Sequence, residues 1–74
     1  MNCDYDKAIG KNIARLRRQK GLTQDQLSAR LQVEGCDLTR SALAKIEVGQ
    51  RHLYPDELKA LKTALNVSFE QLFV

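Results

Sequence analysis

Two short stretches of this sequence carry the same signal for the start of a helix. In "LTQDQL", Thr23 has the position of an N-cap, and Gln26, three residues later, can close a capping box. In "VSFEQL", Ser68 and Gln71 repeat this spacing near the end of the chain. An apolar residue precedes each cap and another follows each box, so a hydrophobic staple can form at both. Two helix starts of this kind predict that a short chain is mainly α-helical.

A first helix is expected before these two. Its inner stripe is formed by Ile9, Ile13 and Leu16, which recur at helical spacing. Gly21 follows this stripe, and we expect it to end the helix in a left-handed conformation. No stretch of the chain alternates strictly enough between apolar and polar residues to predict a strand.

The stretch "TRSALAKIEVGQR" predicts a helix with two different faces, which Thr39 begins and Gly49 ends. Leu43 and Ile46 share the inner side. Glu47 falls beside this apolar pair, where a carboxylate without a partner would be costly to bury. The outer side is small and basic, and consists of Arg40, Ser41, Ala44 and Lys45.

A further helix is expected to begin at Pro55, which suits a first turn, and to stop at Asn66. Its inner face would consist of Leu58, Leu61 and Leu65. Together with the helix that Ser68 begins, this predicts five helices and an all-α fold. The least regular part is the connection over residues 32–38, with Gly35 as a helix end. Its apolar residues, expected in the core, are Val33 and Leu38.

At 74 residues the chain is too short for two ordinary domains and long enough for one small core, so we expect a single domain over residues 1–74. The hydrophobic fraction of 43% argues against a disordered chain. Cys3 and Cys36 are far apart in the sequence, and no apolar segment resembles a leader or a membrane span. We therefore expect a cytoplasmic protein in which both thiols are structural or incidental.

The net charge of +3 is small, but it is unevenly distributed. Residues 11–20, "KNIARLRRQK", hold five bases and no acid, which leaves the rest of the chain slightly acidic. Two interpretations stay open at this point: a solvated helix face, or a positive surface for a polyanion.

The sequence offers no set of residues for catalysis. With one histidine, two separated cysteines and no motif of paired carboxylates, it has neither a nucleophile with its base nor a set of metal ligands. Its four glycines lie well apart, so no phosphate-binding loop is predicted. We therefore expect no enzyme, no cofactor and no metal, and interpret His52 as a loop residue that is exposed or lies near a phosphate.

The order of "LRRQKGLTQDQLSARL" and "TRSALAKIEVGQR" resembles the helix-turn-helix family of phage repressor and Cro proteins, to which XRE-like transcriptional regulators belong. The resemblance covers about residues 9–73. Its motifs are a Gly-Leu-Thr-Gln start to the second helix, here residues 21–24, and a recognition helix that ends in Ile46 and Glu47 before Gly49. It implies a lambda-repressor-like five-helix bundle that binds double-stranded DNA and regulates transcription.

The resemblance also assigns roles to residues. The second helix would cross the DNA backbone, and the third, about residues 40–48, would enter the major groove. The residues expected to read bases are Arg40, Ser41 and Lys45, whose polar groups suit base edges. Those expected to hold phosphates are Gln24, Thr39 and Arg51, the first two at helix starts where anions are favoured.

In the same family an arginine of the first helix pairs with the glutamate that ends the recognition helix, here Arg17 and Glu47. This pairing would remove Arg17 from the DNA-binding residues and leave weaker phosphate candidates on one outer face, Lys11, Arg15 and Arg18. The chain departs from the family at residues 32–38, where the family has a tight turn. A longer second helix or a wider loop would absorb the difference.

One recognition helix reads too few bases to define a site in a genome, so we expect a homodimer on an inverted repeat with half-sites about one helical turn, roughly 34 Å, apart. The candidate contact is the apolar end, Leu72, Phe73 and Val74. Phe69 and Phe73 are otherwise expected in the core. The alternative function is a protein-interaction module on the same fold, antitoxin-like or bridging, because fold does not fix function.

Overall fold

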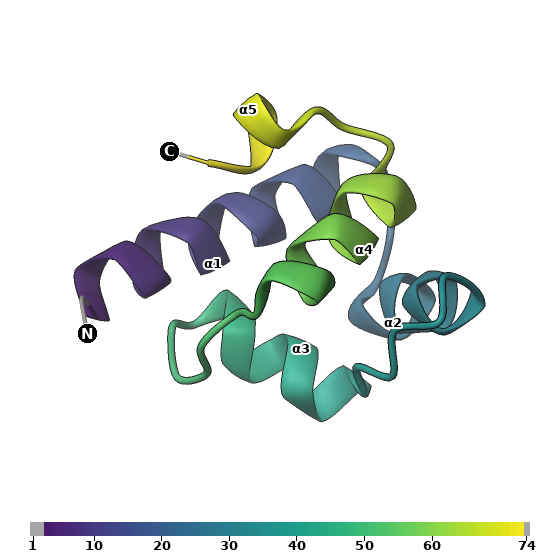
Figure 1. The fold of residues 1–74 in the computed structure, drawn as a ribbon, viewed down its shortest axis with the longest axis horizontal. Helices are drawn as coiled ribbons and strands as arrows, with labels where there is room; N and C mark the ends of the chain where they lie inside the picture. Colours follow the sequence, from purple (N-terminus) through teal and green to yellow (C-terminus); the bar gives the residue numbers. More distant parts are fainter. Residues whose placement is uncertain (1–2, 74) are drawn as a thin grey trace.

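A computed structural model describes residues 3–73, with the backbone alone for Cys3. Over this range the chain forms five helices and no strand, which confirms the predicted all-α fold. The helices are α1 (Cys3–Gln19), α2 (Gln24–Val33), α3 (Arg40–Glu47), α4 (Pro55–Leu65) and α5 (Phe69–Leu72). Figure 1 shows α1 running across the molecule, with α5 along one side of it and α3 along the other.

Both predicted capping boxes are present. The backbone N–H of Gln26 donates to the hydroxyl of Thr23, and the side-chain oxygen of Gln26 accepts from the backbone N–H of Thr23. Ser68 and Gln71 make the same reciprocal pair at the start of α5. The predicted helix ends are also confirmed by positive φ angles, at Gly21, Gly35, Gly49 and Asn66.

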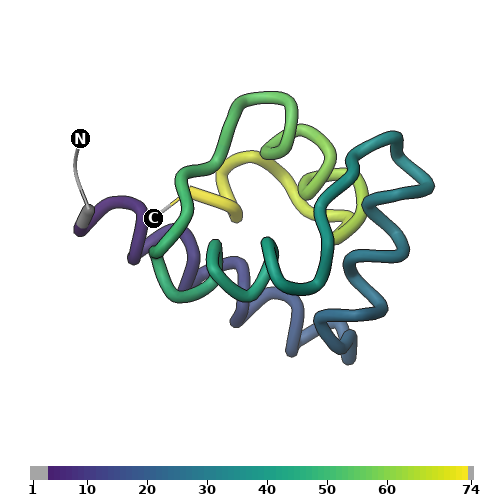
Figure 2. The backbone as a smooth tube through the Cα atoms, turned by 90° about the horizontal axis from the view of Figure 1, so that it is seen from below, coloured from purple at the N-terminus to yellow at the C-terminus, as the bar shows by residue number. Residues whose placement is uncertain are grey.

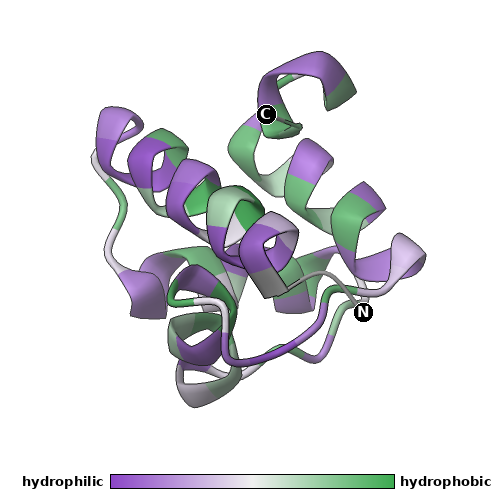
Figure 3. Ribbon diagram, turned by 90° about the vertical axis from the view of Figure 1, so that its left-hand side faces the viewer, coloured by the Kyte–Doolittle hydropathy of each residue, from purple (hydrophilic) through white to green (hydrophobic). Residues whose placement is uncertain are grey.

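One hydrophobic core joins all five helices. Figure 3 shows hydrophilic segments along the outer sides of the helices and hydrophobic segments between them. The largest fully buried side chains are Ile13, Leu27, Leu31, Leu43, Ile46, Leu61, Leu65 and Leu72. Within the described range, no helix is long and apolar enough to span a bilayer.

Three residues expected in the core are exposed instead, so these predictions were wrong. Val33 is 85% exposed, because α2 ends there and Leu38 supplies the buried side chain of the connection. Phe69 and Phe73 are 43% and 40% exposed, since the single turn of α5 buries only Leu72 among its apolar residues. The ring of Phe69 lies under the ammonium group of Lys62, 5.4 Å from ring centre to nitrogen.

The irregular connection combines a longer helix with a wider loop. α2 continues to Val33, and the loop then runs over residues 34–39 (Figure 2). Two hydrogen bonds fix it to α2: the backbone N–H of Cys36 donates to Leu31 O at 2.8 Å, and Ser28 Oγ donates to Leu38 O at 2.6 Å. The half-buried Cys36 packs against the core, and burial raises the pKa of its thiol. The side chain of Cys3 lies outside the described residues.

Two residues of α1 set the positions of its neighbours. At Gly10, an added Cβ would collide with the carbonyl oxygen of Ile46, so α3 crosses α1 where the latter has no side chain. The buried Asn12 fixes α5, because its Nδ2 donates to the backbone oxygens of Gln71 and Leu72 at 2.6 and 2.7 Å. Nothing in the sequence analysis predicted either role.

Candidate nucleic-acid interface

The outer face of α3 has the exposure that a base-reading helix requires. Arg40, Ser41 and Lys45 are exposed, and Leu43 and Ile46 are buried on the opposite face. Within the described range, no hydrogen bond or ion pair engages the side chain of Ser41 or Lys45. Their polar groups are therefore available to a ligand.

The last residue of α3, Glu47, is held from behind by α1. Arg17 donates from Nε to Glu47 Oε2 at 2.7 Å and from Nη2 to Glu47 Oε1 at 3.1 Å. These side chains are only 10% and 4% exposed. Arg17 Nη1 also donates to Leu22 O at 2.8 Å, and Gln24 Nε2 donates to Glu47 Oε1 at 3.0 Å. The pair thus connects α1, the turn before α2, and α3.

The residues expected at phosphates differ in what else they bind. The half-buried Gln24 uses its side-chain nitrogen on Glu47, but it stands in the first turn of α2, where free N–H groups face solvent. The exposed Thr39 caps α3, because its Oγ accepts from the backbone N–H of Ala42 at 3.1 Å. Because the hydroxyl oxygen of Thr39 acts as an acceptor in this cap, its hydroxyl proton remains free to donate.

Arg51 has a partner that the sequence analysis did not anticipate. Its Nη1 and Nη2 donate to the two carboxylate oxygens of Glu57 at 2.9 and 3.0 Å. This bidentate pair raises the pKa of Arg51 and, together with the backbone N–H of Tyr54, lowers the pKa of Glu57. The charge of Arg51 is therefore already compensated in part by Glu57. The neighbouring His52 is half exposed, and its Nδ1 lies 3.5 Å from Asp6 Oδ1.

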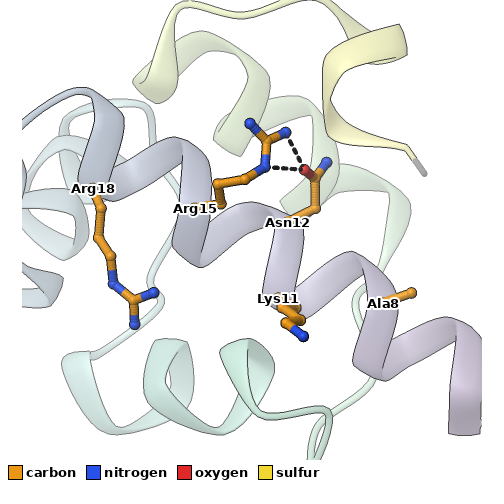
Figure 4. A pocket seen from close by; sticks show the side chains of 5 residues that line it. All are labelled: Ala8, Lys11, Asn12, Arg15 and Arg18. Atoms are coloured by element: carbon orange, nitrogen blue, oxygen red, sulfur yellow. Dashed lines mark hydrogen bonds between the residues drawn. The ribbon is translucent and has the colours of Figure 1, made fainter.

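The basic side chains on the outer face of α1 point in different directions. Lys11, Arg15 and Arg18 line a single open depression together with Ala8 and Asn12. In Figure 4 the guanidinium of Arg15 turns toward Asn12, whose Oδ1 accepts from its Nε at 3.2 Å, whereas Arg18 extends in the opposite direction, toward α3. Of these candidates, Arg18 is the one that lies beside the first residues of α2 and α3, where it lines a groove with Arg40.

Asp25 is a residue of the candidate interface that the sequence analysis missed. It lies in the first turn of α2, and its Oδ1 is 3.8 Å from Arg40 Nε. An acid in a first turn is common because it interacts favourably with the helix dipole, so its position in the sequence carried no signal. Its proximity to Arg40 depends on how α2 and α3 pack together, which the sequence alone does not give.

Comparison with known proteins identifies this arrangement. A family model described as helix-turn-helix matches residues 13–72. The chain belongs to the helix-turn-helix family. This helix-turn-helix protein is 39% identical over 69 residues to the uncharacterized HTH-type transcriptional regulator y4dJ of Sinorhizobium fredii, a match that covers 93% of this chain and 83% of that protein.

The helix-turn-helix fold is also found in a solved structure with the same overall shape. The restriction-modification controller protein C.AhdI from Aeromonas hydrophila superposes with a TM-score of 0.85 and 30% identity, over 96% of each chain. These comparisons confirm the family and the fold class that the resemblance implied, and they support DNA-binding transcription regulation.

Proposed function

We propose that the protein regulates transcription by binding a specific double-stranded DNA sequence, with α3 in the major groove. The observation that carries the proposal is the outer face of α3, which has exposed polar side chains on a helix fixed from behind by the buried Arg17–Glu47 pair. A base-reading helix needs such a fixed support, because small displacements break hydrogen bonds to base edges.

The proposed roles separate reading from positioning. Base edges would be contacted by Arg40, Ser41 and Lys45. The backbone would be held at the first turn of α2 beside Gln24, at Thr39, and at Arg51 through the N–H groups that Glu57 does not use.

We also propose that two copies bind an inverted repeat. Support comes from the exposed aromatic side chain of Phe73 beside α5, which would be covered by a second copy. Leu72, named with it from the sequence, is fully buried and closes the core instead. Val74, the third residue of that predicted contact, lies outside the described residues.

Selection of bound sequences from a random pool of duplexes tests the proposal. The protein should enrich a motif with twofold symmetry, and Lys45→Ala should relax one or two base positions at a cost of about 1–3 kcal/mol on the selected site. Lys59→Ala is the matched control, because Lys59 is an exposed lysine of α4 rather than α3. If the unaltered protein enriches no motif, sequence-specific binding is wrong.

A further inference from the structure

An open groove lies where the end of α1, the turn before α2 and the start of α3 meet. Three arginines line it, Arg17, Arg18 and Arg40. Among the residues that line this groove, Asp25 is the single acid. The groove adjoins both the first turn of α2 and the recognition helix, so it would face the DNA backbone when α3 enters the major groove.

The charges of the groove are compensated unequally. Arg17 is paired with the buried Glu47, and Arg40 lies beside Asp25. Arg18 has no acidic partner within the described range. The positive field that the groove can offer a phosphate is therefore weakened at one point, the position of Asp25.

Folding does not explain the contact between Asp25 and Arg40. Their side chains are 77% and 66% exposed, and an ion pair at that exposure and at 3.8 Å contributes little to stability. The dipole of α2 accounts for an acid in its first turn. It does not account for an acid opposite the first residue of α3, at a surface that would meet phosphates.

The two effects of Asp25 on DNA binding act in different ways. Its negative charge opposes any nearby phosphate, and this lowers affinity for every DNA sequence alike. Its carboxylate also attracts the guanidinium of Arg40 toward α2, which restricts a long side chain with many rotamers. Restricting Arg40 favours one base position over its neighbours.

We propose that Asp25 is a specificity-determining residue of the DNA interface, which holds Arg40 toward α2 and whose charge weakens binding to all DNA alike. The proposal rests on the DNA-binding function proposed above. It predicts that loss of the carboxylate strengthens binding to random DNA and weakens the discrimination between the selected site and random DNA.

The test compares Asp25→Asn with Glu70→Gln, which removes the same charge from an exposed residue of α5, on the other side of α1 from α3 (Figure 1). Affinity is measured for the selected duplex and for a random duplex over a series of salt concentrations. Asp25→Asn should bind random DNA about fivefold tighter at low salt, and the ratio of specific to random affinity should fall about two- to threefold, because the exposed contact between Asp25 and Arg40 is weak. Glu70→Gln should leave that ratio unchanged.

Two further variants separate charge from orientation. Asp25→Glu retains the charge, so binding to random DNA should stay as weak as in the unaltered protein. When Arg40 is already replaced by alanine, Asp25→Asn should still strengthen binding to random DNA, but it should no longer change any base preference.

Two results would overturn the role of Asp25: an unchanged affinity ratio in Asp25→Asn, or an equal fall of the ratio in Glu70→Gln. If the unaltered protein itself shows no preference for any duplex, the proposed function fails instead. The two failures are therefore distinguishable.

Discussion

At the scale of single residues, Glu47 is the carboxylate on which several segments converge. It accepts two hydrogen bonds from Arg17 and one from Gln24, and Arg17 reaches the backbone of Leu22 as well. A buried charge without its partner is far more costly than a buried pair. The orientation of α3 and the stability of the fold therefore depend on the same two side chains.

A double-mutant cycle should detect this dependence. Arg17→Met and Glu47→Gln should each lower the free energy of unfolding by about 3–5 kcal/mol, and the double variant should lose less than the sum. Denaturant unfolding measures all three. The exposed pair of Asp25 and Arg40 provides the comparison, since its coupling energy should stay below about 1 kcal/mol. Additive losses at Arg17 and Glu47 would show that their interaction does not stabilise the fold.

Glu57 should make stability depend on pH. Because its pKa is lowered in the folded state by Arg51, the pair stabilises the fold above the unfolded pKa, about 4.3, and this contribution is lost as the pH falls through the lower folded pKa. Unfolding measured between about pH 3 and pH 7 should therefore show a smaller acid-induced loss for Glu57→Gln than for the unaltered protein. A Glu57→Gln curve that follows the curve of the unaltered protein would contradict the prediction.

Residue pairs differed in how far the sequence could predict them. The partner of Glu47 could be predicted because the resemblance supplies the arginine at that position. The partner of Arg51 was not, because a loop of irregular backbone separates it from Glu57, and no helical or strand spacing relates the two. Asp25 and Arg40 meet only through the angle between α2 and α3, which the length of the connection left open.

At the scale of helices, the sequence predicted where the helices end better than how deeply their side chains are buried. Capping boxes and left-handed residues depend on neighbours in the chain, so they can be read directly from it. Periodicity gives the inner face of a helix, but the neighbouring helices decide how deep that face lies. Phe69 and Phe73 are partly exposed for this reason, since α5 is a single turn that buries Leu72, and Lys62 covers one face of the Phe69 ring.

Gly10 supplies a prediction about the crossing of α1 and α3. Gly10→Ala should lower the free energy of unfolding by at least about 2 kcal/mol, despite the better helix propensity of alanine, because the new Cβ meets the Ile46 carbonyl oxygen. It should also weaken binding to the selected DNA, since α3 must shift. Unfolding and affinity are both measured.

Gly21→Ala is the matched control for this substitution. There the backbone has a φ of +71° and no atom lies within 4 Å of an added Cβ, so the cost is a strain of about 1–2 kcal/mol without displacement of α3. Equal losses of DNA affinity, once stability is accounted for, would show that the crossing at Gly10 does not position the recognition helix.

At the scale of the whole molecule, the proposed dimer joins two copies of the same interface. Phe73→Glu should raise the dissociation constant of the pair by at least about tenfold, because it places a charge in an apolar contact. The free energy of unfolding of the monomer should fall by less than the free energy of pairing, since this side chain is already 40% exposed in the monomer. Sedimentation measures the oligomeric state of the free protein, and a footprint on the selected site measures that of the bound protein. A monomer that protects one asymmetric half-site would contradict the dimer.

The outer face of α3 has a consequence for how such proteins diversify. Ser41 and Lys45 have no partner within the described range, and Arg40 has one that contributes little to stability, so the side chains that would choose a DNA sequence take almost no part in holding the fold together. Substitutions there can accumulate at little risk to folding, and a duplicated gene could change its target through a few exposed positions. The buried Arg17 and Glu47 would meanwhile stay the same, because they support α3 whichever bases its outer face contacts.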